Sequence, residues 1–141
     1  MTVKVSMLCK DAIHLNALIY KTSAYCHEQV QASVLMHGQL LKTKIQARAS
    51  GRPGPNAPTG DYRRSWGLEF FPSAKSPSVL VGTNKPQGRR LEYGFTGADS
   101  LGRVYNQPPY PHVAPAFDEV EKLFYKDLLK IVDKLVKGWE K

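Results

Sequence analysis

Helix-breaking residues are concentrated in the middle of this 141-residue chain. All ten prolines lie between Pro53 and Pro115, and nine of the eleven glycines lie between Gly51 and Gly102. Proline lacks a backbone N–H and clashes with the preceding helical turn, so long helices are confined to the two flanking segments. The pattern predicts a single α+β domain over residues 1–141, the size of one ordinary domain. Its parts are a helical segment (1–50), a small central antiparallel sheet with long Pro/Gly-rich loops (51–113) and a C-terminal helix (114–138).

Apolar side chains recur with helical spacing before the proline-rich centre. The stripe consists of Ile19, Cys26, Val30, Val34, His37, Leu41 and Ile45. Steps of three, four and seven follow the 3.6-residue period, so we expect one long helix from about Asp11 to Ser50. Asp11 is the expected N-cap and Gly38 the expected site of a bend. Residues 2–7 alternate in polarity and predict a short edge strand before this helix.

The C-terminal segment has the clearest helical pattern. Its stripe is Phe117, Val120, Phe124, Leu128, Ile131 and Leu135. Pro115 is expected as the first helical residue, since its missing N–H costs nothing there. Acidic residues follow in the first turns, where the helix dipole favours them, and Gly138 marks the end. We therefore expect an amphipathic helix.

Short strands are expected between the two helices. Residues 64–71 and 78–82 are rich in aromatic and β-branched side chains and are separated by a Pro/Ser turn, which predicts an antiparallel pair. Residues 89–93 fit either a third strand or a helical turn. Residues 94–112 are rich in glycine and proline and are expected to form a long loop.

The net charge of +8 is carried mainly by the centre of the chain. All seven arginines lie there: Arg48, Arg52, Arg63, Arg64, Arg89, Arg90 and Arg103. Arginine suits phosphate and carboxylate contacts, so DNA, RNA or an acidic protein are the candidate partners. Trp66 beside two arginines could form a stacking platform for bases. The favoured interpretation places Trp66 in the core and its arginine neighbours in solvent.

The sequence contains no strong catalytic, cofactor or metal-binding motif. The glycine-rich stretch 51–60 lacks the Gly-Lys-Ser/Thr ending of a phosphate loop, and its prolines remove backbone donors. The four histidines (His14, His27, His37 and His112) have no metal-ligand spacing. A nuclease remains an alternative, and it would have to use scattered acids such as Glu92 and Asp99. We expect a protein that is not an enzyme.

Features that would place the chain in a membrane or an oxidising compartment are also missing. No run approaches the roughly 18 apolar residues that span a bilayer, and Lys10 and Asp11 interrupt any signal-peptide core. Two cysteines, Cys9 and Cys26, are too few for a disulfide framework. The sequence predicts a protein without a membrane partner, with reduced thiols, made in the cytoplasm.

Three segments of the central region resemble a known family. They are Ala57-Pro-Thr-Gly-Asp-Tyr-Arg-Arg-Ser65, then Val81-Gly-Thr83 with Leu91-Glu-Tyr-Gly94, then Pro108-Pro-Tyr-Pro-His-Val-Ala-Pro-Ala-Phe117. Their order and the flanking helices resemble the tailed-phage neck proteins called head–tail joining or tail-completion proteins, which are similar to minor tail protein Z. The chain departs from the family pattern at Tyr62, Phe95 and Tyr110, where leucine, threonine and phenylalanine are usual.

The resemblance implies a structural virion protein that forms a ring, with six copies expected, at the head–tail junction of a long-tailed phage. The implied partners are further copies, a connector or stopper, a tail terminator or tail tube, and DNA passing through the channel. The matching motif residues would serve the interfaces: Thr59, Gly60, Arg63, Ser65, Glu92, Gly94, Pro108, Pro109, Tyr110, Pro111 and Pro115. The seven arginines would face DNA or an acidic partner, and no cofactor is implied. The alternatives are a terminator or stopper ring of the same neck and a small basic nucleic-acid-binding protein acting alone.

Overall fold

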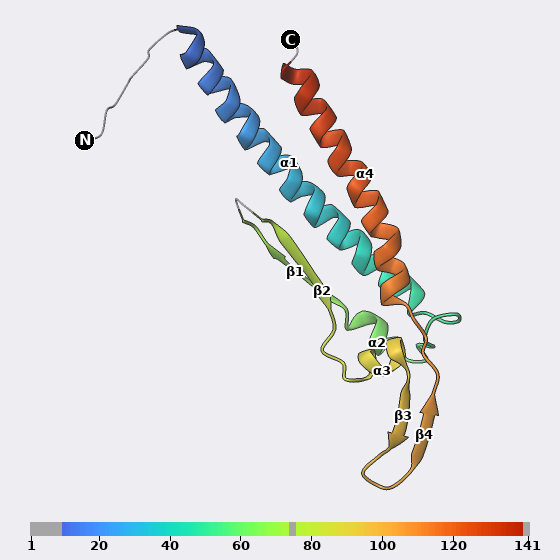
Figure 1. Cartoon of the computed structure of the whole chain (residues 1–141). Helices are drawn as coiled ribbons and strands as arrows, with labels where there is room; N and C mark the ends of the chain where they lie inside the picture. Colours follow the sequence, from blue (N-terminus) through green and yellow to red (C-terminus); the bar gives the residue numbers. More distant parts are fainter. Residues whose placement is uncertain (1–9, 74–75, 140–141) are drawn as a thin grey trace, which may run out of the picture.

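The computed structural model describes residues 10–73 and 76–139 and confirms the α+β class (Figure 1). In chain order the elements are α1 (Lys10–Arg48), α2 (Asp61–Arg64), β1 (Gly67–Phe71), β2 (Ser78–Gly82), α3 (Gln87–Tyr93), β3 (Phe95–Ala98), β4 (Val104–Gln107) and α4 (Val113–Trp139). The strand expected at residues 2–7 lies outside the described residues.

The two long helices, α1 and α4, run antiparallel and side by side (Figure 1). Members of the two expected stripes meet where the helices pack: His37 of α1 is buried and contacts the ring of Phe124 of α4, with centroids 5.3 Å apart. Near the base of the pair, Glu119 of α4 forms ion pairs with Lys44 at 2.5 Å and with Arg48 at 3.1 Å. These half-exposed charges add to the apolar contact between the helices.

Two local expectations for α1 are wrong. Lys10, the first described residue, already belongs to the helix, so Asp11 lies inside α1 and is not its N-cap. The helix also continues without a break through Gly38, which serves close packing instead of a bend. A Cβ atom on Gly38 would lie 2.6 Å from both γ-carbons of Val79 on β2, so only glycine lets the β1–β2 hairpin approach α1 this closely.

The centre holds two separate two-stranded antiparallel sheets instead of one. β1 pairs with β2 from Gly67↔Gly82 to Phe71↔Ser78, and β2 has the bounds expected from the sequence. The first strand starts later than expected, because Asp61–Arg64 forms the helical turn α2 after Gly60, whose φ is 72°. Residues 89–93 belong to a helical turn, α3.

The second sheet corrects the expectation of a long loop over residues 94–112. β3 and β4 pair from Phe95↔Gln107 to Ala98↔Val104 and form a hairpin that extends from the end of the helix pair (Figure 1). Gly94, with φ 77°, precedes the hairpin, and a Cβ there would lie 2.8 Å from the carbonyl oxygen of Gln107. A side chain at this position would therefore push β4 away.

The buried core is small and lies where α1 ends and α4 begins. It consists of Ile45, Ala49, Tyr62, Trp66 and Ala116, with Leu41, Val81, Leu91 and Val113 packed against it. The favoured interpretation of Trp66 is confirmed, since its indole is buried while Arg63 and Arg64 are exposed. α4 begins at Val113, so Pro115 is its third residue instead of its first, still within the first turn, where backbone N–H groups lack helical partners.

Candidate functional site

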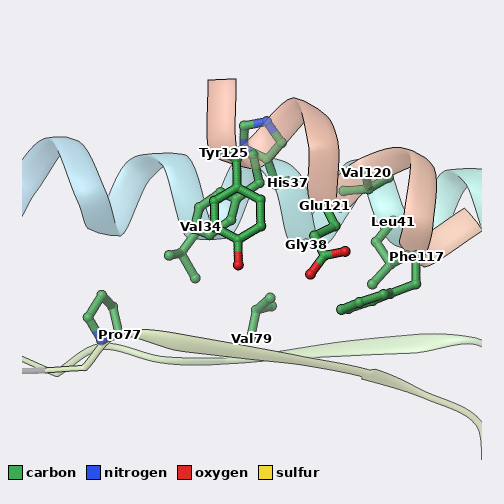
Figure 2. A pocket seen from close by; sticks show the side chains of 11 residues that line it. Val34, His37, Gly38, Leu41, Pro77, Val79, Phe117, Val120, Glu121 and Tyr125 are labelled. Atoms are coloured by element: carbon green, nitrogen blue, oxygen red, sulfur yellow. The ribbon is translucent and has the colours of Figure 1, made fainter. Parts of the chain in front are cut away.

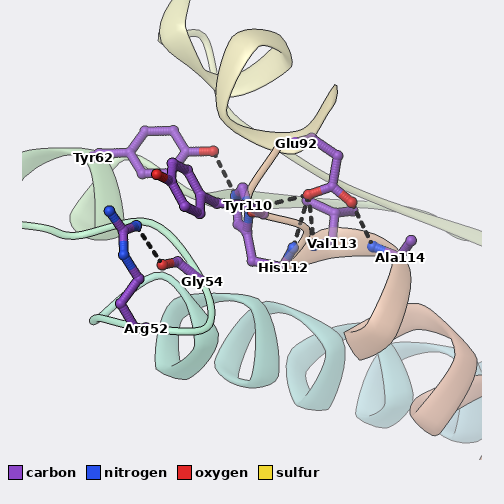
Figure 3. A network of polar contacts seen from close by, with 8 residues as sticks. All are labelled: Arg52, Gly54, Tyr62, Glu92, Tyr110, His112, Val113 and Ala114. Carbon is purple, nitrogen blue, oxygen red and sulfur yellow. Dashed lines mark hydrogen bonds and ion pairs between the residues drawn. The ribbon is translucent and has the colours of Figure 1, made fainter. Parts of the chain in front are cut away.

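The three sequence segments that carry the resemblance meet at the start of α4 (Figure 3). We call this site the α4 cap cluster and define it by Tyr62, Glu92, Tyr110 and His112. Glu92, near the end of α3, lies with its carboxylate against the first backbone N–H groups of α4. Because those N–H groups have no intrahelical partner and the helix dipole favours negative charge there, a carboxylate is the fitting cap.

Three backbone N–H groups donate to the two carboxylate oxygens of Glu92. Oε2 accepts from His112 at 2.9 Å and from Val113 at 3.0 Å, and Oε1 accepts from Ala114 at 3.0 Å. Burial alone raises the pKa of Glu92, but these hydrogen bonds and the adjacent His112 outweigh it and bring the pKa below its ordinary value. Glu92 is therefore a buried, ionised cap supplied by a different helix.

His112 is completely buried and has partners on both ring nitrogens. Nδ1 lies 2.9 Å from the carbonyl oxygen of Tyr110 and 3.0 Å from Glu92 Oε2, so it carries the proton and donates. Nε2 lies 2.8 Å from the hydroxyl of Tyr62, which donates to it. This tautomer is assigned from the hydrogen-bond network, which satisfies every polar atom of the ring.

Tyr62 is the third buried polar member of the cluster. Burial, and then the negative charge of Glu92, raise the pKa of its hydroxyl to about 12. Its ring also packs edge-on against Trp66 and His112, with centroids 6.0 Å and 5.6 Å apart. Tyr62 therefore supplies both packing and a hydrogen-bond donor to the α4 cap cluster.

Other motif residues hold the same region together from within the chain. The hydroxyl of Ser65 lies 2.6 Å from that of Thr83, which joins the first and second motifs. The backbone N–H of Tyr110 donates to the carbonyl of Leu91 at 2.7 Å, and the guanidinium of Arg52 lies 3.8 Å from the centre of the Tyr110 ring. The motif residues that stay exposed are Thr59, Arg63, Pro108, Pro109 and Pro111.

Most of the arginines have partners within the chain. The pairs are Arg48 with Glu119, Arg52 with Tyr110 and the Gly54 carbonyl, Arg63 with Ser50, Arg64 with Asp61, Arg90 with the Phe95 ring, and Arg103 with Asp99. Arg89 is exposed and has no partner within the described residues. Carboxylates pair with Arg48, Arg64 and Arg103, whereas the partners of Arg52, Arg63 and Arg90 are uncharged and leave their charge uncompensated.

The carboxylates of Glu92 and Asp99, the acids named for the nuclease alternative, both accept hydrogen bonds from within the chain. The carboxylate of Glu92 caps α4, as described above. Asp99 lies in the β3–β4 turn, where its oxygens accept from the backbone of Leu101 and from the backbone and side chain of Arg103. Across residues 10–73 and 76–139, no group of three or more His, Cys, Asp or Glu side chains is placed to hold a metal ion.

The chain exposes more surface than a compact protein of its mass. Its accessible surface is 10785 Å², against about 7,300 Å² expected for a compact protein of this mass. The residues outside the described part could add about 2,100 Å² at most, the area that they would expose in an unfolded chain. The accessible surface in excess of a compact protein therefore comes from the described part of the chain.

A second apolar stripe lies along α4 on a side that α1 does not cover. This outer stripe consists of Tyr125, Leu129, Val132 and Val136, which step by four, three and four and are between 51% and 69% exposed. Its first member also lines an apolar groove of about 310 Å³ between α1, α4 and β2. Figure 2 shows Tyr125 and Phe117 reaching from α4 toward the hairpin across this groove. The spacing of the outer stripe is readable from the sequence, although the predicted stripe of this helix was the one that faces α1.

The β3–β4 hairpin is a second poorly covered element. Leu101 in its turn and Val104 on β4 are among the most exposed apolar residues described, at 75% and 81%. A two-stranded hairpin is only marginally stable unless a helix or further strands pack against it. In Figure 1 the hairpin projects beyond the ends of both long helices.

Comparisons of the chain with protein-family models, with curated proteins and with solved structures give no match. Within the described residues, no helix is both long and apolar enough to cross a membrane.

Proposed function

We propose that this chain is a structural subunit of a homo-oligomeric ring at the head–tail junction of a long-tailed phage, acting in tail completion or head–tail joining. The motif resemblance suggests the class of protein. The observation that carries the proposal is the outer stripe of α4, because four large apolar side chains at helical spacing form a surface suited to burial by another chain. The protein's place of action would be the virion, after synthesis in the host cytoplasm.

A ring requires two different surfaces on each subunit that fit one another repeatedly. The outer stripe and the adjoining groove supply one such surface, and the projecting β3–β4 hairpin can supply the other by reaching a neighbour. The α4 cap cluster would fix the angle between them, since it joins α3, the end of the hairpin and the start of α4. Neighbouring layers of the neck, the connector or stopper and the tail terminator or tube, would contact the two ends of the ring.

The association state of the purified protein tests this proposal. Analytical ultracentrifugation from 5 to 500 µM should show a species heavier than a monomer for the wild type. Leu129→Ser should shift it to monomer with an unchanged circular dichroism spectrum. Met36→Ser is the matched control, because Met36 is an exposed apolar residue of the other long helix, and it should associate like the wild type.

Two results would count against the proposal. A wild type that stays monomeric at 500 µM would favour the small nucleic-acid-binding protein that acts alone. A reconstruction of the phage neck in which this chain has no position at the junction would exclude the assignment to that structure, including the terminator and stopper alternatives.

A further inference from the structure

The folded α4 separates charges that balance in its sequence. Within Val113–Trp139 there are five acidic and five basic side chains, so the segment carries no net charge. The acidic members are Asp118, Glu119, Glu121, Asp127 and Asp133, and the basic members are Lys122, Lys126, Lys130, Lys134 and Lys137. Their positions around the helix decide which charges a partner would meet.

The acidic side chains mostly face the rest of the chain. Glu119 binds two cations of α1, and Asp127 Oδ2 accepts from the hydroxyl of Ser33 on α1 at 2.6 Å. Glu121 lines the apolar groove, and Asp118 lines a depression beside α3. Asp133 is exposed and is paired with Lys137 at 2.8 Å, so each neutralises the other.

Four exposed lysines of α4 have no partners among the described residues, and the last of them, Lys134, borders a depression between α4 and α1. Lys122, Lys126, Lys130 and Lys134 are all exposed, and within the described part of the chain none forms an ion pair or a side-chain hydrogen bond. We call them the α4 lysine row. They follow one another at intervals of four residues, about 6 Å each, so the row is about 18 Å long. Like charges at this spacing repel one another, so the row concentrates positive charge along α4 that a bound polyanion would neutralise.

We propose that the α4 lysine row binds the phosphate backbone of nucleic acid without sequence preference. Lysine acts as a point charge, and the row holds no arginine or aromatic side chain that would read or stack on bases. Its length corresponds to about five base-pair steps at 3.4 Å. The nucleic-acid surface is therefore a lysine face of α4, whereas three of the central arginines, Arg48, Arg64 and Arg103, are paired with carboxylates of the chain.

This face and the outer stripe occupy different sides of α4. At 100° per residue, the row winds from beside the outer stripe toward the far side of the helix, so a neighbour that covers the stripe leaves most of the row open. The inference names the partner of this face within the proposed ring, but binding through the row does not require a ring. Measuring association and binding separately therefore distinguishes a failure of one proposal from a failure of the other.

Fluorescence anisotropy with a labelled 30-base-pair duplex tests the inference. With four phosphates neutralised, the slope of log affinity against log salt should be about −3.6, which corresponds to roughly 150-fold weaker binding at 200 mM than at 50 mM salt. The double variant Lys126→Gln/Lys130→Gln should lower affinity at least tenfold at 50 mM and bring the slope to about −1.8. Glutamine has a similar helix propensity, so the fold should be retained, which circular dichroism checks.

Lys85→Gln/Arg89→Gln is the matched control. It removes the same charge from two exposed cations next to α3, away from the row, and should change affinity less than twofold. An equal loss in both double variants would mean that net charge alone drives binding and would overturn the proposal. So would a wild type that fails to bind the duplex at 50 mM salt. Binding of polyglutamate or of anionic vesicles through these lysines, with no binding of DNA, would assign the row to an acidic protein or a membrane surface instead.

Discussion

Glu92 holds His112 at two points: Oε2 accepts the backbone N–H of His112 at 2.9 Å and lies 3.0 Å from Nδ1 of its ring. The two residues belong to different motifs, one at the end of α3 and the other just before α4. Their contact fixes where α4 starts and places the imidazole against Tyr62. Through this contact, two of the sequence motifs join α3 to the start of α4.

Glu92→Gln should destabilise the fold by about 2 kcal/mol, because the amide keeps the shape of the carboxylate but loses its charge and turns an N–H toward buried backbone donors. Urea unfolding followed by circular dichroism measures the change in free energy of unfolding. Glu69→Gln is the control, since Glu69 is exposed on β1, and its effect should stay within about 0.5 kcal/mol. Equal effects of the two substitutions would contradict the capping role.

Acid should remove the contribution of Glu92. Its pKa in the folded state lies below the ordinary value of 4.5, so the unfolded chain takes up the proton first and stability falls as pH decreases from about 5 toward 3. Asp61 and Glu119, whose pKa values are lowered chiefly by hydrogen bonds from Arg64 and Lys44, add to this slope. The difference between wild type and Glu92→Gln isolates the Glu92 share and should shrink over that interval. A difference that is constant from pH 7 to pH 3 would show that folding does not lower the pKa of Glu92.

High pH should destabilise the fold through Tyr62 of the α4 cap cluster. The pKa of Tyr62 is about 12 in the folded state against 10.0 ordinarily, so the unfolded chain loses this proton first. The contribution of Tyr62 to stability is fully present below pH 10 and should be lost between about pH 10 and pH 12, a fall of roughly 1–3 kcal/mol. Tyr62→Phe removes this titration, and its free energy of unfolding should depend less on pH over the same interval. Parallel profiles for the two proteins would mean that the hydroxyl is not buried.

The helices and β2 were predictable because their signals are local. The proline distribution and the apolar periods define α1 and α4, and residues 78–82 form a short β-branched run. The β3–β4 hairpin was missed because its strands are four residues each and lie between glycines, so only their pairing across the turn reveals them. The turn α2 was missed because it depends on the left-handed conformation of Gly60.

The candidate site was less predictable than the fold. Glu92 was identified from the motif, but its capping role depends on backbone groups about 20 residues away that only the folded chain brings near. The separation of acids from lysines on α4 likewise depends on partners in α1, such as Lys44 and Ser33. The outer stripe is the exception, since the steps from Tyr125 to Val136 are a purely local pattern.

The contact between Gly38 and Val79 should make substitutions at the two positions strongly coupled. Gly38→Ala adds a methyl group 2.6 Å from both γ-carbons of Val79, an overpacking that costs about 1–3 kcal/mol, and gains up to about 1 kcal/mol of helix propensity. In a Val79→Ala background the γ-carbons are gone, so the cost of Gly38→Ala should fall sharply or change sign. A double-mutant cycle by urea unfolding should give a coupling free energy of at least about 1 kcal/mol. Additive effects would show that the β1–β2 hairpin does not lie against α1 at Gly38.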